Sequence, residues 1–417
     1  WGIDVNPETN KIYRTNCQSN TISVISGSTD SVIATILAGR MPYGIDVNPI
    51  TNKVYVTSWG FNDVSIIDAL NNVVTANIKV GISPMGIKGN FTTNKIYVTN
   101  TGSENVSVIN ASTNSLIKNI YIGKWPGDVA VNPNTNKVYI SRDDHNVSVI
   151  DGLTDSVLKT ISINGRSEGI AVNTSTNKVY VANLDSAILV MNGSTDSIIK
   201  IVGEGKKWPH SIGVNPQTNK IYVTTGEGNL LVIDGAIDSL IKTIKVGEYP
   251  WGIGISSKIN RIYVANTDTT ISVIDGTTDS VIQKVTVGRC PWFIAVNDST
   301  GRIYVPCLFD GTVWVLVDTK GVEENISSIA QGIATLLITK NPFIKSTIIS
   351  YYLPTKSKVS LSIYDITGRP AQTLINEIKP AGSYNLTLNA KNYPSGVYFL
   401  KLNAGEQKIV KKLVLIQ

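Results

Sequence analysis

The sequence predicts an all-β protein, and three observations support this. A tyrosine anchor recurs at intervals of 41 or 42 residues, which indicates one supersecondary unit copied in tandem. Each copy divides into four short alternating or apolar runs separated by turn residues, as β-strands do. No apolar period of 3.6 residues is sustained, so a helical repeat is excluded. The eight anchors are Tyr13, Tyr55, Tyr97, Tyr139, Tyr180, Tyr222, Tyr263 and Tyr304.

The copy around Tyr263 shows the four strands of one unit. We expect them at residues 251–255, 260–266, 270–275 and 279–288. Four antiparallel strands in a repeat of 40–45 residues are typical of a propeller blade, whose first strand lines the central channel and whose fourth forms the rim. The turn motif Asn-Pro-x-Thr-Asn-Lys precedes the second strand in four of the copies. It begins at Asn6, Asn48, Asn132 and Asn215.

The eighth copy departs from the pattern at its end. After residues 313–318 the chain continues into 319–325 without a recognisable fourth strand, and the chain opens at Trp1 directly on a first strand. We therefore predict an eight-bladed β-propeller whose last blade is incomplete in this chain, with a processed or truncated N-terminus. An open edge invites pairing with another chain, so self-association by strand donation to blade eight is expected.

The tyrosine anchors also carry a family resemblance. The run Tyr97–Asn100 reads Tyr-Val-Thr-Asn, and Tyr-Val-Ala-Asn begins at Tyr180 and Tyr263. These runs resemble the YVTN family of β-propeller repeats over residues 1–318, and we assign the propeller to residues 1–320. Surface-layer-type proteins, lactonase-like enzymes and binding modules share such repeats, so the resemblance implies the fold and leaves the function open.

A second domain is expected after a linker at residues 321–334. Residues 335–417 contain short alternating strands that suit a small β-sandwich. The runs 363–369, 395–398 and 411–415 resemble the Ig-like C-terminal sorting domain (type A) of type IX secretion cargo. The resemblance implies handling by the type IX machinery through residues 335–417, and an extracellular or outer-surface location on a Gram-negative bacterium.

Charge and hydropathy exclude two classes of partner. Residues 335–417 hold eleven Lys/Arg and three Asp/Glu, a net of +8, so the formal charge of +6 leaves about −2 for the rest. The bulk of the chain is therefore not a nucleic-acid binder. No apolar run approaches the ~18 residues of a membrane-spanning helix. No cofactor or metal site is expected.

The residues just before each first strand should ring one mouth of the channel. Flat aromatics there could stack on sugar rings or clamp a peptide, or they could be spacers packed between adjacent blades. Deeper in the channel, Asp4, Asp46 and Lys88 are expected to form a salt-bridged lining. In the fourth blade the ring position falls on Pro126, with Trp125 just before it. The candidate ligand-binding residues are Trp1, Tyr43, Met85, Trp125, Glu168, Trp208, His210, Trp251 and Trp292.

The sequence offers little for catalysis. His145 and His210 should project on one face two blades apart, as exposed loop histidines. No Gly-x-Ser-x-Gly elbow and no phosphate-binding loop is present. We therefore expect a protein that is not an enzyme. The alternative is a lactonase-like or lyase-like propeller enzyme, which would draw on Arg14, Arg142, Asp143, Glu168 and His210.

Two covalent features are candidates. Cys290 and Cys307 flank the first hairpin of blade eight, which makes a disulfide plausible, with Cys17 as a competing partner. A recurring Asp-Ser-apolar pattern resembles a Bacteroidota O-glycosylation signature, or it is a turn that leads into the fourth strand. The candidate glycosylated residues are Ser31, Ser156, Ser197, Ser239 and Ser280.

Together these features predict an exported, non-catalytic protein with a structural or interaction role at the cell surface or in an extracellular filament, self-assembling through its open blade edge. A propeller enzyme and a glycan-binding or peptide-binding propeller are the alternatives.

Overall fold

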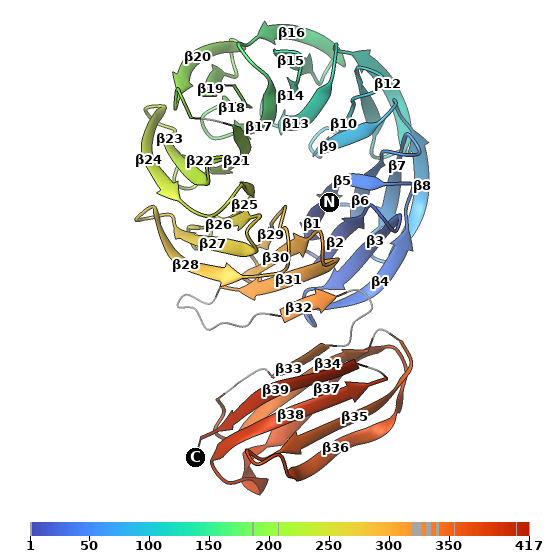
Figure 1. Cartoon of the computed structure of the whole chain (residues 1–417). Helices are drawn as coiled ribbons and strands as arrows, with labels where there is room; N and C mark the ends of the chain where they lie inside the picture. The colour runs from blue at the N-terminus through green and yellow to red at the C-terminus, as the bar shows by residue number, and fades with distance from the viewer. Residues whose placement is uncertain are drawn as a thin grey trace.

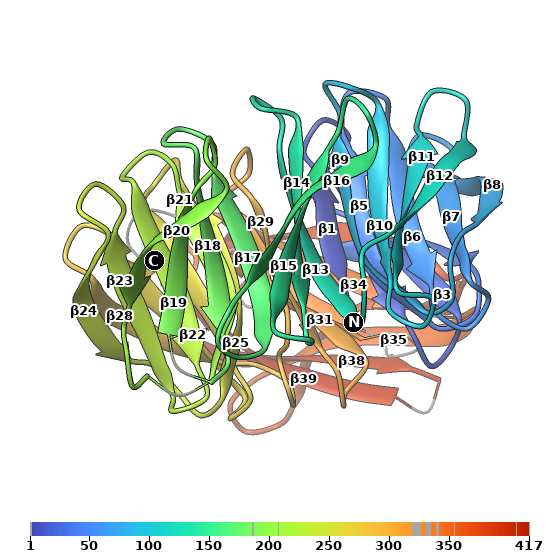
Figure 2. The ribbon, with the colours of Figure 1, turned by 90° about the horizontal axis from the view of Figure 1, so that it is seen from above.

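The computed structural model describes residues 2–185, 187–206, 208–318, 327–330, 335–338, 342–353, 355–405 and 407–416. It contains eight four-stranded antiparallel sheets arranged as a ring, followed by two sheets of a separate sandwich. Figure 1 looks along the central channel, and Figure 2 shows the ring from its side. The all-β prediction of an eight-bladed propeller and a sandwich is confirmed.

Within each blade the strands pair in chain order, and we name them A to D from channel to rim. Blade one is β1 (Ile3–Asn6), β2 (Lys11–Asn16), β3 (Thr21–Ser26) and β4 (Ser31–Leu37); blade two is β5 (Pro42–Asn48), β6 (Lys53–Ser58), β7 (Asp63–Asp68) and β8 (Val73–Lys79); blade three is β9 (Pro84–Asn90), β10 (Lys95–Asn100), β11 (Asn105–Asn110) and β12 (Ser115–Tyr121); blade four is β13 (Pro126–Asn132), β14 (Lys137–Arg142), β15 (Asn146–Asp151) and β16 (Ser156–Ser162).

The second half of the ring repeats this order. Blade five is β17 (Ser167–Asn173), β18 (Lys178–Asn183), β19 (Ala187–Asn192) and β20 (Ser197–Val202); blade six is β21 (Pro209–Asn215), β22 (Lys220–Thr225), β23 (Asn229–Asp234) and β24 (Ser239–Lys245); blade seven is β25 (Pro250–Ser256), β26 (Arg261–Asn266), β27 (Thr270–Asp275) and β28 (Ser280–Thr286); blade eight is β29 (Ala295–Asn297), β30 (Arg302–Cys307), β31 (Thr312–Val317) and β32 (Ser327–Ala330).

Blade eight is completed by the chain itself. Strand β32 pairs antiparallel with β31, from Thr312 opposite Ala330 to Val315 opposite Ser327. The prediction of an incomplete last blade is therefore wrong, and the rim position offered to a donated strand is filled. β32 lies inside the predicted linker, at residues 327–330. It escaped notice because it is only four residues long and lacks the apolar pattern of the other rim strands.

The anchor tyrosines explain why the blades stack. All eight are at most 1% exposed, and they pack in the apolar layers between adjacent blades. Several reach the C–D turn of the next blade with their hydroxyls: Tyr139 and Tyr180 donate to Asp196 (3.2 Å) and Asp238 (3.3 Å). The repeat period is thus fixed by contacts between neighbouring blades as well as within each blade.

Two polar links repeat around the ring and also close it. A lysine at the start of strand B pairs with the C–D turn of the next blade, as Lys137 does with Asp196 at 2.6 Å. At the closure, Arg302 of blade eight pairs with Asp30 of blade one at 2.9 Å. Asn297 likewise donates to Asn10 at 2.9 Å, the same asparagine link that joins Asn132 to Asn177. The same side-chain links that join neighbouring blades therefore also join the last blade to the first.

The same lysine link gives the Asp-Ser pattern a structural role. Its aspartates adopt left-handed backbone conformations, with φ near +50°, and receive the cation of the preceding blade. Ser31 is buried, and its hydroxyl lies 2.8 Å from that of Thr29. The turn interpretation accounts for the recurrence, and glycosylation remains a prediction.

The three cysteines are free thiols. Cys307 is buried in the apolar layer between blades seven and eight, whereas Cys290 lies half-buried in the loop that leads to β29. The two segments are joined through the backbone, since Leu308 N donates to Cys290 O at 3.0 Å. The two thiol side chains nevertheless lie in different surroundings, that of Cys307 in the apolar layer and that of Cys290 in the loop. The predicted Cys290–Cys307 disulfide is therefore not formed.

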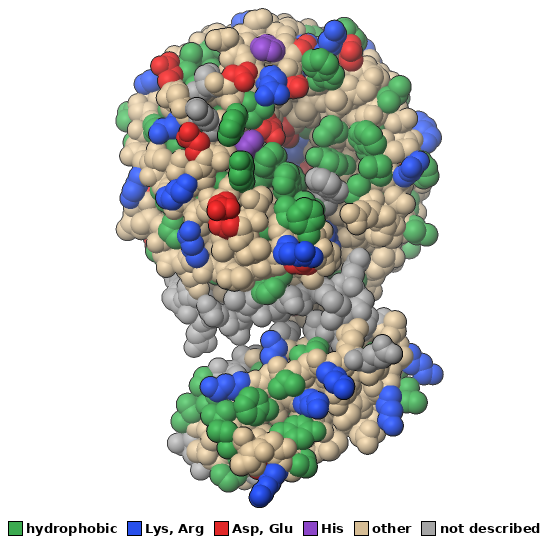
Figure 3. Space-filling model, in the orientation of Figure 1, with side chains coloured by type: hydrophobic (Ala, Val, Ile, Leu, Met, Phe, Trp, Pro, Cys, Tyr) green, Lys and Arg blue, Asp and Glu red, His purple; other side chains and the backbone are tan. Residues whose placement is uncertain are grey.

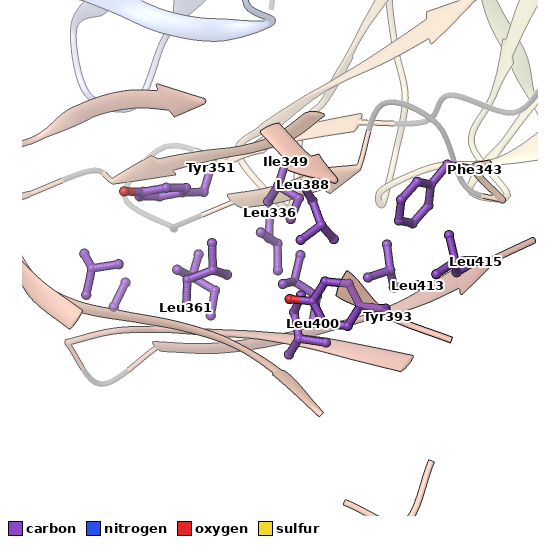
Figure 4. Close-up of a cluster of buried hydrophobic side chains, with 14 of the residues drawn as sticks. Leu336, Phe343, Ile349, Tyr351, Leu361, Leu388, Tyr393, Leu400, Leu413 and Leu415 are labelled. Atoms are coloured by element: carbon purple, nitrogen blue, oxygen red, sulfur yellow. The ribbon is translucent and has the colours of Figure 1, made fainter. Parts of the chain in front are cut away.

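The C-terminal sandwich packs two sheets around its own core. One sheet has the order β33 (Thr335–Ile338), β34 (Ser346–Leu353), β37 (Gly382–Asn389); the other has β36 (Pro370–Lys379), β35 (Ser357–Tyr364), β38 (Gly396–Ala404), β39 (Gln407–Leu415). A 3-10 turn, η1 (Ala390–Asn392), leads into β38. Leu336, Ile349, Leu361, Leu400 and Leu413 lie between the sheets (Figure 4). Among the described residues, no helix is long and apolar enough to cross a membrane.

Candidate binding site at the mouth of the channel

A β-bulge near the start of each long strand A positions one side chain at the channel mouth. In blades five, six and seven the pairing with strand B shifts between Ser167 and Ile170, Pro209 and Ile212, and Pro250 and Ile253. Such a bulge changes the direction in which a side chain leaves the strand. The residue it carries is the second of the strand.

A hydroxyl of the preceding blade fixes the backbone of this bulge. Ser141 Oγ donates to Glu168 O at 2.7 Å, and Thr224 Oγ1 donates to Trp251 O at 3.0 Å. Thr57 and Thr99 make the same bond to Met85 O and Gly127 O. The threonine of the Tyr-Val-Thr-Asn run therefore holds the mouth residue of the following blade, a role that the sequence analysis missed.

The structure places most of the predicted positions near the start of strand A of their blades, and their role in ligand binding stays a prediction. The described members of the ring are Tyr43, Met85, Gly127, Glu168, His210, Trp251 and Trp292, and Trp1 lies outside the described residues. The prediction that Pro126 occupies the ring position is wrong. Pro126 begins strand β13, as Pro42 begins β5 and Pro84 begins β9, so the ring position falls on Gly127. Trp125 and Trp208 stand two residues ahead of the ring, in the loops that join strand D to strand A (the D–A loops).

Four consecutive blades contribute a continuous stack, which we call the inner ladder: Glu168, His210, Trp251 and Trp292. Glu168 Oε2 lies 2.7 Å from His210 Nδ1, the His210 and Trp251 rings stack at 4.3 Å, and the Trp251 and Trp292 rings at 4.4 Å. His210 is thus not the exposed loop histidine predicted, since it sits in β21 with a mostly buried side chain. Both faces of the Trp251 ring are therefore covered by its neighbours, and only the ring edges are left uncovered by the stack.

The freely exposed aromatics stand just outside the ladder. Trp125, Trp208 and Tyr249, in the D–A loops, are 52%, 49% and 58% exposed. All three have positive φ, at 48°, 52° and 39°. A left-handed backbone costs a bulky residue roughly 1–2 kcal/mol, so these positions carry strain without core packing in return.

Gly226 connects Trp208 to the ladder. A Cβ on Gly226 would come within 3.0 Å of Trp208 Cε3 and 3.4 Å of His210 Nε2. The backbone of Gly226 also donates to Trp208 O at 2.9 Å. Both side chains therefore rest against this glycine, which holds the exposed indole in a fixed place beside His210.

Deeper in the channel, charged residues of strand A form the channel group: Asp4, Asp46, Lys88 and Asp128. Lys88 Nζ pairs with Asp46 Oδ1 at 2.5 Å, as the salt-bridged lining predicted. The second oxygen of Asp46 accepts Gly89 N at 2.8 Å, and Asp4 Oδ2 accepts Val47 N at 2.9 Å. Desolvation within the channel raises the pKa of both Asp4 and Asp128 to about 6, and the Asp46 carboxylate raises the pKa of Lys88.

Asp128 gives a testable pH dependence. Its pKa lies at about 6 instead of 3.8, so between these pH values the folded protein keeps a proton that the unfolded chain has lost. Its contribution to stability therefore falls as the pH rises through this window. We expect Asp128→Asn to gain stability relative to the parent from pH 4 to 6. The gain is limited to about 1 kcal/mol because Asp128 is exposed toward the channel, where solvent screens its charge. Urea unfolding at several pH values measures the difference, and a difference that does not change with pH would contradict the raised pKa.

The residues considered for catalysis do not converge. Arg14 is buried between blades and donates to Gly311 O at 2.8 Å. Arg142 pairs with Asp144, and Asp143 faces Arg166 at 3.9 Å. Glu168 and His210 are the pair brought into contact. Among the described residues no group of three or more His, Cys, Asp or Glu side chains could hold a metal ion.

Comparisons with known proteins agree with the two-part architecture. Residues 341–417 match the family described as secretion system C-terminal sorting domain. No curated protein matches the chain. The matched tail indicates a protein secreted by the type IX system to the outer surface or the extracellular space.

Solved structures resemble the propeller at low identity. They include Kuenenia stuttgartiensis hydrazine synthase (16% identity, 76% of this chain and 95% of that chain, TM-score 0.55) and the dihydro-heme d1 dehydrogenase NirN in complex with DHE (14%, 78% and 74%, 0.66). The computationally designed Ika8 protein is similar to the same extent (14%, 74% and 93%, 0.65). At these identities the likeness concerns the fold alone.

Proposed function

We propose that this chain is an exported, non-catalytic binding protein that recognises an extracellular ligand at the channel mouth. The observation that carries the proposal is the distribution of exposed aromatics. In the described propeller, all of them lie in B–C turns, in D–A loops or at the end of a strand D that leads into such a loop, which is one face of the ring. They are Trp59, Phe61, Tyr121, Trp125, Trp208, Tyr249 and Phe309.

The opposite face offers a contrast. The large exposed apolar residues of its turns are aliphatic: Ile50, Leu70, Leu153 and Ile237. Figure 3 shows the mouth face, with hydrophobic side chains around a central hollow and charged side chains among them. Aromatics that combine an apolar body with a polar edge are enriched where proteins bind ligands, so the asymmetry favours recognition on this face.

Trp251→Ala tests the proposal, because Trp251 joins the two halves of the inner ladder. Intrinsic tryptophan fluorescence is titrated with extracellular polysaccharides and with peptides. We expect at least one ligand to change the signal, and Trp251→Ala to weaken its binding about tenfold or more, as central aromatic residues of binding sites do. Leu153→Ala, which removes an exposed side chain from the opposite face, is the control. Equal binding by the parent and both folded variants would contradict a site at the mouth.

One contact favours an enzyme as the second candidate. Glu168 and His210 lie 2.7 Å apart at the mouth, as an acid–base pair could. A lactonase-like or lyase-like activity would appear as turnover of a lactone panel by the parent chain. Turnover that disappears in a folded His210→Ala variant would overturn the non-catalytic proposal.

A further inference from the structure

We propose that the ligand of the mouth face is an acidic polysaccharide, held by an arc of D–A loop residues outside the inner ladder. This inference rests on the proposed function and adds the chemical class of the ligand and a second contact surface. The outer arc spans the loops that lead into β13, β17 and β21, and it consists of Lys124, Trp125, Arg166, Lys206 and Trp208.

The two indoles of the outer arc provide flat, water-exposed surfaces. Unlike Trp251, whose faces are covered, Trp125 and Trp208 are each about half exposed. Both occupy left-handed backbone positions that in blades two and three hold Met41 and Ser83. The left-handed backbone belongs to the loop and does not require an aromatic residue, so a half-exposed indole at this position points to a use outside the fold. The apolar face of a pyranose ring suits such a surface.

Unpaired basic groups accompany these indoles. Lys124 precedes Trp125, and Lys206 lies two residues before Trp208; in the described part of the chain neither lysine has a carboxylate within ion-pair distance. The Arg166 side chain faces Asp143 at 3.9 Å, with both side chains about half exposed, which is a weak pair, and the Arg166 backbone N–H donates to Asp185 Oδ2 at 3.1 Å.

The contrast with the other lysines is clear. At the start of strand B, Lys95, Lys137, Lys178 and Lys220 are each bound to a carboxylate of the next blade at 2.6–2.7 Å. At the same position Lys11 and Lys53 donate to carbonyl and amide oxygens of the next blade, so the cations of strand B are held by neighbours, whereas Lys124 and Lys206 have no carboxylate partner in the described part of the propeller. Glu204, Asp143 and Asp185 offset the summed charge of these loops, so the attraction is local to Lys124 and Lys206, which have no carboxylate partner among the described residues. Carboxylate or sulfate groups of a polysaccharide would pair with these two ammonium groups.

The channel group sets the direction in which the ligand lies. Asp4, Asp46 and Asp128 outnumber Lys88, and Glu168 adds another carboxylate at the mouth. An anionic chain is repelled from this interior while the arc attracts it. The polysaccharide therefore lies along the D–A loops of blades four to six, outside the inner ladder, and does not thread the channel.

The arrangement fits a polysaccharide better than an acidic peptide. Peptides commonly add to an open strand edge or lie in a continuous apolar groove. Here the indoles come from separate blades, with charged side chains between them, and strand A is paired on one side and faces the channel on the other. Separated flat surfaces match a chain whose sugar rings repeat at regular intervals.

The test titrates the full chain with a polygalacturonate oligosaccharide of defined length, its fully methyl-esterified neutral form, and poly-glutamate of similar charge, by calorimetry at two salt concentrations. We expect the acidic oligosaccharide to bind at least tenfold more tightly than the neutral form, and more weakly at higher salt. Trp125→Ala and Trp208→Ala should each weaken it roughly tenfold, and Arg166→Gln should weaken it and flatten its salt dependence.

Matched controls lie on the same face in the D–A loop and B–C turn of blade two. Trp59→Ala removes an exposed indole and Arg40→Gln an exposed cation outside the arc, and both should change affinity less than twofold. Equal binding of acidic and neutral forms would overturn the acidic ligand while mouth binding stands. If the arc variants lose no more affinity than the two control variants, the outer arc is not the contact surface. If poly-glutamate binds as tightly as the acidic oligosaccharide, the ligand need not be a polysaccharide. If none of the polysaccharides and peptides titrated in the fluorescence experiment binds, the proposed function is contradicted as well.

Discussion

Tyr263→Ala is expected to lower the free energy of unfolding by roughly 3–5 kcal/mol, the cost of emptying a fully buried aromatic site. Tyr263 is 1% exposed and packs in the apolar layer between blades seven and eight. Its hydroxyl also donates to Asp318 Oδ2 at 2.6 Å, which ties blade seven to the residue that follows strand β31 of blade eight. Urea unfolding followed by circular dichroism measures the loss.

Two phenylalanine variants separate the hydroxyl from the ring. Tyr263→Phe removes a partner of the buried Asp318 carboxylate and should cost about 1–3 kcal/mol. Tyr304→Phe removes a buried hydroxyl that has no hydrogen-bond partner among the described residues, and should be neutral or slightly stabilising. Equal losses of unfolding free energy in the two variants would show that the hydrogen bond between Tyr263 and Asp318 does not stabilise the propeller.

A chain that ends after Asp318 is expected to be less stable than one that ends after Ala330, by about 2–4 kcal/mol for the lost strand pairings. The shorter chain lacks β32 and leaves β31 as an open edge, which should promote self-association. Both chains lack the sandwich, so its removal cannot explain the difference. Thermal unfolding and light scattering measure the two effects.

The result also bears on the assembly first expected from the sequence. If the chain that ends after Ala330 is monomeric and the one that ends after Asp318 associates, β32 protects the edge in the native protein. Identical melting temperatures and identical monomers would mean that β32 contributes nothing to blade eight.

The fold could be read from the sequence because its determinants are local and repeated. The tyrosine anchors, the Asn-Pro turns and the Asp-Ser turns each occupy one place in a blade, so their period gave the blade count and the strand order. β32 could not be found in this way, since its residues 327–330 pair through the backbone and carry no repeat signal. The predicted disulfide was wrong for a related reason. A hairpin brings the backbones at Cys290 and Cys307 together, but the sequence does not show that the Cys307 side chain packs in the layer between the blades.

The site was only partly predictable. Glu168, His210, Trp251 and Trp292 were placed at the mouth by their position before strand A, but their stacking depends on the bulge and on hydroxyls of preceding blades. The exposed set was harder still. Trp125, Trp208 and Tyr249 differ from the ladder by a left-handed backbone, and the only sequence signal for it is their place just ahead of a strand-initial proline.

Oxidative footprinting of the full chain with and without the acidic oligosaccharide tests recognition at the channel mouth most directly. Hydroxyl radicals label exposed aromatic side chains, and mass spectrometry reads each of them separately. We predict that Trp125 and Trp208 lose reactivity on binding while Trp59 and Phe309 keep theirs. Protection confined to the opposite face of the ring or to the sandwich, with Trp125 and Trp208 unchanged, would contradict it.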